Sequence, residues 1–159
     1  MYDARDDILA LFKQSTYDND LKTFYYITAT DGTNSVNVEI CKSEDNALNK
    51  NLPLVVLSLA DAKSLAADIS GNIRQDVCLI DCNIYVNRSG NFDAEALIDD
   101  IVDEITSTIW NNQGSITNAF AECIAMRDLT GLEKEPVLRK LIEIRVTKIN
   151  KKSWAGKEG

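Results

Sequence analysis

Residues 75–110 read QDVCLIDCNIYVNRSGNFDAEALIDDIVDEITSTIW, and this stretch decides which class of fold we expect. Over residues 75–87 apolar and polar side chains alternate, which predicts a half-buried strand. Over residues 93–110 the apolar side chains recur every three or four positions, which predicts an amphipathic helix. The segment NRSGN at 87–91 is typical of a turn between the two, and NNQG at 111–114 ends the helix. A strand followed at once by a helix therefore forms the centre of the predicted fold.

Further runs of apolar or alternating residues predict strands on both sides of this centre. They cover residues 23–30, 35–41, 53–60, 115–128 and 137–149. Asp31 and Gly32 are typical of a hairpin turn between the first two strands. The run at 53–59 is continuously apolar, which predicts a strand covered on both faces. In the strand at 115–128 we expect most of the larger apolar side chains to share one face, namely Ile116, Phe120, Ile124 and Met126.

Two more helices are predicted outside the central stretch. The first covers residues 3–13, where Ile8, Leu9 and Phe12 fall on one stripe and acidic residues crowd the first turn. The second is short and runs from Asp61, which caps it, to Gly71, which ends it. Both helices would pack against the sheet.

The remaining segments complete the domain prediction. Residues 42–51 are polar and rich in asparagine, which predicts a long loop, and residues 150–159 are polar and lysine-rich, which predicts a flexible tail. Strands joined by hairpins with few helical crossovers are typical of α+β proteins. We therefore predict a single α+β domain over residues 1–149, with a mostly antiparallel sheet and helices packed on one face.

The composition indicates a soluble protein without a membrane anchor. The chain has 159 residues, of which 45% are apolar and 26% are charged, as in ordinary globular domains. No apolar run approaches the roughly 18 residues that a membrane-spanning helix needs. The first residues, MYDARDD, are acidic where a secretory signal peptide would be basic. We therefore expect a cytoplasmic protein that makes no membrane contact.

The residue types present exclude several kinds of catalysis. The chain has no histidine, which excludes Ser-His-Asp and Cys-His mechanisms and histidine-ligated metals. Its four cysteines have no CxxC spacing, and we expect reduced, mostly buried thiols at Cys41, Cys78, Cys82 and Cys123. The glycine motifs that bind dinucleotides or nucleoside triphosphates are missing as well. We therefore predict no catalytic residues, no cofactor and no metal site.

The charge distribution suggests a contact between copies of the chain. The net charge is −8, and phosphate binding needs clustered lysine and arginine, so we expect no specific nucleic-acid binding. Residues 81–126 carry a net charge of −7, whereas residues 127–159 carry +4. We predict that a basic C-terminal strand of one copy approaches the acidic helix of its neighbour. The residues of this interface hypothesis are Asp99, Asp100, Asp103, Glu104, Arg139, Lys140, Arg145 and Lys148.

The two tryptophans are expected to have different roles. Trp154 stands alone in a polar tail, which favours a contact with a partner. Trp110 is expected to form a lid on the core.

The acidic helix has two alternative roles besides the contact with a neighbouring copy. It binds a divalent metal, or it is an exposed face whose repulsion is screened by salt.

The order of elements resembles that of the tail terminator family of long-tailed bacteriophages and proviruses, also described as tail completion or minor-tail-protein-U-like proteins. An N-terminal helix, DARDDILALFK, precedes an apolar strand, LPLVVLSL. A strand and turn, DVCLIDCNIYVNRSGNFD, then lead into the helix AEALIDDIVDEITSTIW. Two long strands follow, ITNAFAECIAMRDLTG and VLRKLIEIRVTKIN.

This resemblance implies a structural role in virion assembly. Proteins of the family form a homo-oligomeric ring, commonly a hexamer, on the last ring of the tail tube, halt its growth and present a surface to the neck or head connector. The family has no catalytic residues to transfer. The resemblance implies a place in the cytoplasm during assembly and in the virion tail afterwards. The alternatives are another neck or connector subunit, a small homo-oligomeric α+β adaptor, or an enzyme of the metal-carboxylate type.

Overall fold

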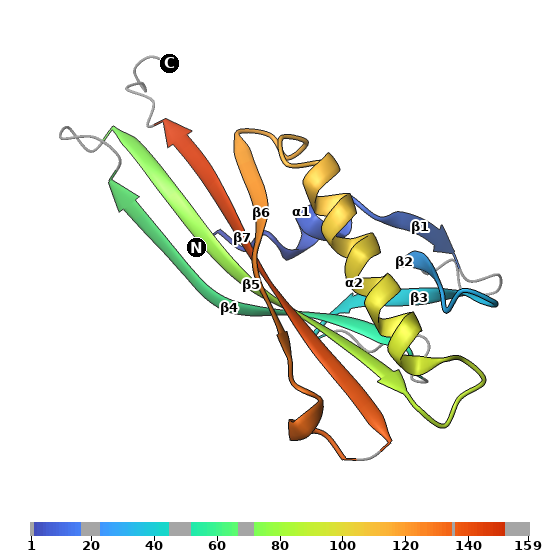
Figure 1. Ribbon diagram of the computed structural model, residues 1–159. Helices are drawn as coiled ribbons and strands as arrows, with labels where there is room; N and C mark the ends of the chain where they lie inside the picture. The colour runs from blue at the N-terminus through green and yellow to red at the C-terminus, as the bar shows by residue number, and fades with distance from the viewer. Residues whose placement is uncertain (1, 17–22, 45–51, 67–71, 135, 152–159) are drawn as a thin grey trace.

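A seven-stranded sheet forms the framework of the computed structural model (Figure 1). The structure describes residues 2–16, 23–44, 52–66, 72–134 and 136–151. The strands are β1 (Lys13–Thr16), β2 (Thr23–Thr30), β3 (Ser35–Lys42), β4 (Leu54–Ala66), β5 (Ile73–Asn87), β6 (Ala119–Asp128) and β7 (Val137–Lys151). They lie in the order β1-β2-β3-β4-β5-β7-β6, and all neighbours are antiparallel except β3 and β4. The predicted α+β class is therefore confirmed.

One long helix, α2 (Ala94–Asn111), lies across one face of this sheet, as predicted. The carboxylate of Asp93 caps its first turn and accepts a hydrogen bond from the Ala96 N–H at 3.3 Å. Its buried stripe faces the sheet and consists of Leu97, Ile98, Ile101, Ile105 and Ile109. Two short helices, α1 (Arg5–Leu9) and η1 (Thr130–Leu132), complete the fold.

The core lies between α2 and the central strands β5 and β7. The strict alternation predicted for β5 is confirmed, because its even-numbered residues from Cys78 to Val86 are buried. On β7 the even-numbered residues Ile142, Ile144 and Val146 are fully buried opposite them. Each isoleucine that leaves water completely contributes about 1.5–3 kcal/mol to folding, so this layer holds the helix on the sheet.

The predicted helix that begins at Asp61 is wrong, because β4 continues as a strand. Beyond a bulge between Leu59 and Asp61, β4 pairs with β5 as far as Ala66. Hydrogen bonding to a long neighbouring strand outweighs the modest helix preference of this segment. The end of the predicted helix, residues 67–71, lies outside the described residues.

The predicted N-terminal helix is shorter than expected. It ends at Leu9, and Lys13–Thr16 form β1, an edge strand that pairs with β2. Phe12 still packs against the core, but from the turn between helix and strand. Of this strand only Lys13 falls within the predicted helix, and pairing with β2 satisfies the strand's backbone. Most of the predicted loop at 42–51 lies outside the described residues.

The last two strands also differ from prediction in detail. β6 begins at Ala119 rather than at 115, and β7 continues to Lys151, two residues into the predicted tail. The rest of that tail, residues 152–159, lies outside the described residues. The continuously apolar β4 is not covered on both faces, because Val55 and Leu57 are buried whereas the intervening side chains are only partly so.

The apolar side chains of β6 do not share one face. Phe120 lies opposite Thr147, on the sheet face away from α2, whereas Met126 lies opposite Ile142, on the α2 face. A bulge between Cys123 and Ala125 causes the difference, because one extra residue reverses the alternation. The expectation of a single apolar stripe is therefore wrong.

Candidate interaction surfaces

The acidic face of α2 is partly neutralised within the chain. Asp99 forms an ion pair with Lys140 of β7 at 2.5 Å. Asp100 accepts a hydrogen bond from the backbone N–H of Thr30 at 2.8 Å. Asp103 and Glu104 are exposed on the same helix. Half of the predicted acidic surface therefore serves the fold, and the other half faces solvent.

The basic residues of β7 lie on both faces of the sheet rather than on one. Lys140 and Lys148 lie on the α2 face, and the Lys148 ammonium sits 4.9 Å from the centre of the Tyr2 ring. Arg139 and Arg145 lie on the opposite face, away from both α1 and α2. Because odd and even positions of a strand point in opposite directions, these four residues do not form the single patch that the interface hypothesis requires.

Polar side chains form a network on the sheet face away from α2, which we call the open face. The Arg139 guanidinium donates to the side-chain oxygen of Asn83 at 2.8 Å and lies 5.5 Å from the centre of the Tyr85 ring. Nearer the sheet edge, two ion pairs link β6 to β7: Arg127 with Glu143 at 3.3 Å, and Arg145 with Glu122 at 3.1 Å. Opposite charges directly across or diagonal to one another stabilise a strand pair.

One like-charge pair interrupts this network. Asp81 of β5 lies directly opposite Glu143 of β7. Burial raises the pKa of Asp81, and the neighbouring charge of Glu143 raises it further, while Arg127 and Arg139 act in the opposite direction. Glu143 is itself paired with Arg127, so its charge is already partly compensated.

The carboxylates that the metal-carboxylate alternative requires are scattered. Asp81 lies on the open face, whereas the acidic residues of α2 lie on the other side of the sheet. Within the part of the chain that the structure describes, no three His, Cys, Asp or Glu side chains gather to hold a metal ion. Asp81 and Glu122 therefore lie on the opposite side of the sheet from the described acidic residues of α2.

The cysteines are buried thiols, as predicted for most of them. Cys41, Cys78 and Cys82 are buried, and Cys123 is half-buried; none forms a disulfide. Burial raises the pKa of Cys123 to about 11 and that of Cys82 further still. At neutral pH both thiols are protonated and therefore poor nucleophiles.

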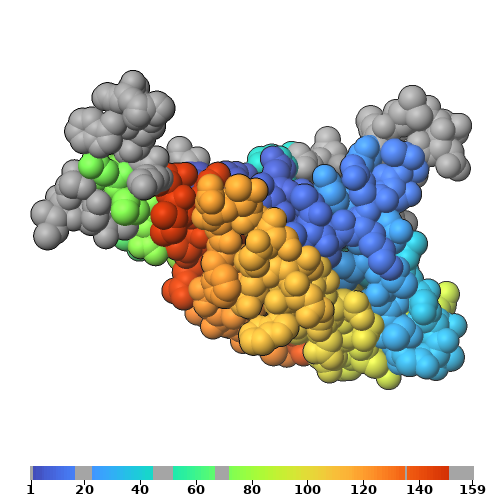
Figure 2. Space-filling view, turned by 90° about the horizontal axis from the view of Figure 1, so that it is seen from above, coloured from blue at the N-terminus to red at the C-terminus, as the bar shows by residue number. Residues whose placement is uncertain are grey.

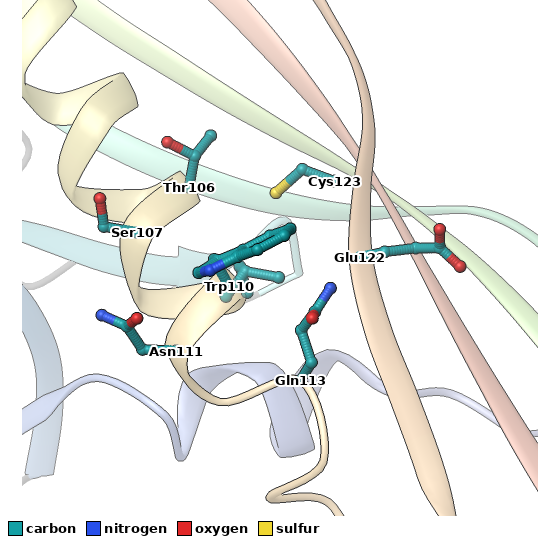
Figure 3. A pocket seen from close by; sticks show the side chains of 8 residues that line it. Thr106, Ser107, Trp110, Asn111, Gln113, Glu122 and Cys123 are labelled. Carbon is teal, nitrogen blue, oxygen red and sulfur yellow. The ribbon is translucent and has the colours of Figure 1, made fainter.

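A hollow of about 460 Å³ lies between the end of α2 and β6 (Figure 3). The Trp110 ring lies in this space and the Cys123 thiol points toward it, whereas Glu122 points away to the other side of the strand. Trp110 is 72% exposed, so the prediction that it forms a lid on the core is wrong. The ring extends beyond the buried stripe of α2 toward the free edge of β6.

β6 is an edge strand with exposed apolar side chains. Among the described strands it pairs only with β7. Phe120, Ile124 and Met126 are 46%, 43% and 52% exposed. Seen from above, the end of α2 and the start of β6 lie at the surface beside β7 (Figure 2). We call these three residues and Trp110 the apolar edge: Phe120 lies on the sheet face away from α2, and Met126 and Trp110 lie on the α2 side. Exposed apolar side chains along an edge strand are typical of a protein contact.

Sequence reasoning missed this surface. Trp110 is expected to form a lid on the core, although at 100° per residue it lies on the side of α2 away from the buried stripe, and this position is the available signal for its exposure. Most of the larger apolar residues at 115–128 are expected to share one face of the strand. The spacing of Phe120, Ile124 and Met126 gives no signal of a bulge, because these even-numbered positions would share one face of a regular strand. Only the register against β7 reveals the bulge, which turns Met126 to the face opposite Phe120.

The comparisons with known proteins assign no family to the chain. No protein-family model matches it, and no curated protein matches it either. Among the described residues, none of the helices combines the length and the apolar character needed to cross a membrane.

Proposed function

We propose that this protein is a structural assembly subunit that associates with copies of itself. The observation that carries the proposal is the apolar edge, because exposed apolar side chains lie on both faces of a strand that pairs, among the described strands, only with β7. Edge strands of this kind are normally shielded by charges, covered by another element, or paired with another chain. Self-association would shield this one.

In the form that the resemblance to tail terminators implies, the subunits cap a tail tube and present the surface that joins the head. The exposed residues Asp103 and Glu104 are then the part of the acidic helix still free to meet a basic surface of the tube or of a neighbouring copy. Ion pairs at such a surface contribute only about 0–1 kcal/mol each, so apolar burial supplies the affinity while charge sets the orientation.

A small homo-oligomeric adaptor is the second candidate. The position of the apolar edge favours it, since an edge strand can be covered completely by one further copy without a tube or a connector.

Solution mass and electron microscopy test the proposal. We expect the mass measured by light scattering to exceed the 17.7 kDa of one chain as the concentration rises. Rings in negative-stain images, together with shorter tail tubes when the protein is added to growing tubes, would support the capping role. Assemblies of fixed size that leave tube length unchanged would favour the adaptor. A monomer at every concentration, with no effect on tubes, would contradict both.

A further inference from the structure

We propose that two copies of the chain join edge to edge through antiparallel pairing of β6 with β6 of the second copy, around a two-fold axis at Ala125. The inference deepens the proposed self-association, because it names the strand and the register that the second copy uses. It rests on the free length of the edge, the bulge, and the charges on either side of it.

The free part of the edge is bounded on both sides. At its start, the Ala121 N–H donates to the Gln113 carbonyl at 3.1 Å, so the segment before β6 already occupies the outer edge there. At its end, the Leu129 N–H donates back to the Arg139 carbonyl at 2.9 Å. Between these points, residues 122–128 pair with no described residue on their outer side, and the middle residue of this stretch is Ala125.

The bulge places two opposite charges on one face of the strand. Glu122 lies opposite Arg145, and Arg127 lies opposite Leu141; these partners are four residues apart on β7 and so share the open face. In a regular strand, residues five apart such as Glu122 and Arg127 would point to opposite faces. The extra residue at Ile124 removes this difference.

The same extra residue satisfies the symmetry of a two-fold pair. When two identical strands pair around a two-fold axis, facing residues must be an even number of positions apart. Counted without the bulged Ile124, Glu122 and Arg127 are four positions apart, and Ala125 lies midway between them. The axis through Ala125 therefore sets Glu122 of each copy opposite Arg127 of the other, on the open face, where opposite charges attract.

This register also covers apolar side chains on the α2 face. It places Cys123 of one copy opposite Met126 of the other. Because the Cys123 thiol points into the hollow that holds Trp110, the second copy's Met126 would pack beside that ring. Methionine sulfur packs favourably against aromatic rings. Met126 and Trp110, both exposed in the single chain, would therefore be covered in the dimer. Because of the two-fold axis, this contact would form at both ends of the seam.

The backbone geometry is compatible with this pairing. The Ala121 N–H points outward, so by alternation the backbone groups of Cys123 and, beyond the bulge, Met126 point outward too. These two residues face one another in the proposed register and would exchange hydrogen bonds. Ala125 then faces its own copy as a non-hydrogen-bonded pair, in which Cα atoms lie about 4.5 Å apart.

A cysteine at the axis tests the register directly. In the Ala125→Cys variant, two thiols would face each other within reach of a disulfide. We expect diamide to convert this variant to a covalent dimer at low micromolar concentration. Wild type, which keeps Cys123, and Ser35→Cys, at the exposed start of β3, should remain monomeric on non-reducing gels. Failure of Ala125→Cys to cross-link faster than Ser35→Cys would overturn the proposed seam.

Charge exchange distinguishes the seam from the contacts inside one chain. Glu122→Arg and Arg127→Glu should each weaken dimerisation at least tenfold in sedimentation equilibrium, and the double variant should recover most of the loss. The double variant also breaks both ion pairs with β7 inside one chain. If dimerisation depended only on those internal pairs, the double variant would dimerise more weakly than either single variant. That ranking would overturn the proposal. Tail-tube length is measured separately: tubes shortened by a protein that does not pair through β6 would refute the seam and leave the capping role intact.

Discussion

At the scale of single residues, the buried guanidinium of Arg5 is paired with carboxylates of opposite charge. Arg5 is only 6% exposed, and its guanidinium binds the carboxylates of Asp3 and Glu44. The hydrogen bond from Arg5 lowers the pKa of Asp3, and Arg5 likewise lowers the pKa of Glu44. A buried guanidinium without such partners would be costly, so this cluster holds the N-terminal segment against the sheet.

The Arg5 cluster makes stability depend on acidic pH. Because Asp3 and Glu44 have lower pKa values in the folded protein than in the unfolded chain, their contribution is full above the unfolded values and is lost as pH falls through the folded ones. We expect the free energy of unfolding of wild type to fall between about pH 5 and pH 2, and that of Arg5→Gln to fall less steeply. Urea unfolding across this range measures both, with Lys63→Gln, on the exposed part of β4, as the control. Equal slopes would contradict the assignment.

The raised pKa of Cys123 predicts a slow thiol. At pH 8 a group with a pKa of about 11 is ionised to roughly one part in a thousand, so alkylation by iodoacetamide should be far slower than for an exposed cysteine. Mass spectrometry of the native protein over time measures this rate. The same experiment in urea should modify all four thiols quickly. Fast native labelling of Cys123 would show that its thiol is ionised or better exposed than the structure indicates.

At the scale of elements, α2 is held by its buried stripe and by its cap. Ile101 is 0% exposed and Ile105 is 1% exposed, and both face the strands of the core. The Asp93 side chain caps the first turn. The backbone N–H of Asp93 donates to the carboxylate of Asp31, in the β2–β3 hairpin, at 2.9 Å. The helix is therefore tied at its start to a hairpin far away in the sequence.

Shortening one side chain in the stripe should cost more than any change on the exposed helix face. We expect Ile101→Ala to lower the free energy of unfolding by about 2–5 kcal/mol, because it removes apolar burial and leaves a cavity. Ser107→Ala, on the exposed face of the same helix, should change it by less than about 0.5 kcal/mol. Thermal and urea unfolding measure the pair. Similar losses in the two variants would mean that the stripe is not the packed face.

Removing the cap has a smaller and separable effect. Asp93→Ala should cost about 1 kcal/mol, because the Ala96 N–H loses its side-chain acceptor. Asp93→Asn keeps an acceptor oxygen and should restore most of that loss. Urea midpoints of the three proteins give the comparison, and an unchanged midpoint for Asp93→Ala would show that the cap contributes nothing.

At the scale of the whole molecule, charge is divided between the fold and the surface. The chain carries a net charge of −8, yet Asp99 and all four basic residues of the interface hypothesis have partners within the same chain. Any docking role of the acidic helix therefore rests on Asp103 and Glu104. The apolar edge is a different surface, at the end of the sheet formed by β6.

Reversing the two exposed acidic charges tests the proposed tube contact without disturbing the fold. We expect Asp103→Lys/Glu104→Lys to weaken tail-tube capping at least tenfold in the concentration required, while the melting temperature stays within a few degrees of wild type. Tube lengths measured by electron microscopy give the readout. The matched control is Lys63→Glu/Ser64→Glu, which changes charge on β4 instead. Normal capping by the helix variant would remove the acidic helix from the proposed interface.

Long and regular periodicity was sufficient to predict three elements of this fold without any knowledge of their neighbours. The alternation in β5, the apolar stripe of α2 and the alternation in β7 each express one buried face, and together they predict the α+β class and most of the core. Local pattern suffices there because burial and backbone geometry favour the same structure.

Other features depend on contacts between strands, because strand pairing there overrides the local preference of the sequence. The segment after Asp61 becomes a strand because β5 lies beside it, and Lys13–Thr16 becomes a strand because β2 does. The bulge at Ile124 likewise depends on the register against β7, and it determines which side chains of β6 reach solvent. The exposure of the β6 side chains could not be predicted for the same reason: whether Phe120 and Met126 are core or surface depends on the bulge and on which strand ends the sheet, and a single sequence does not specify strand order.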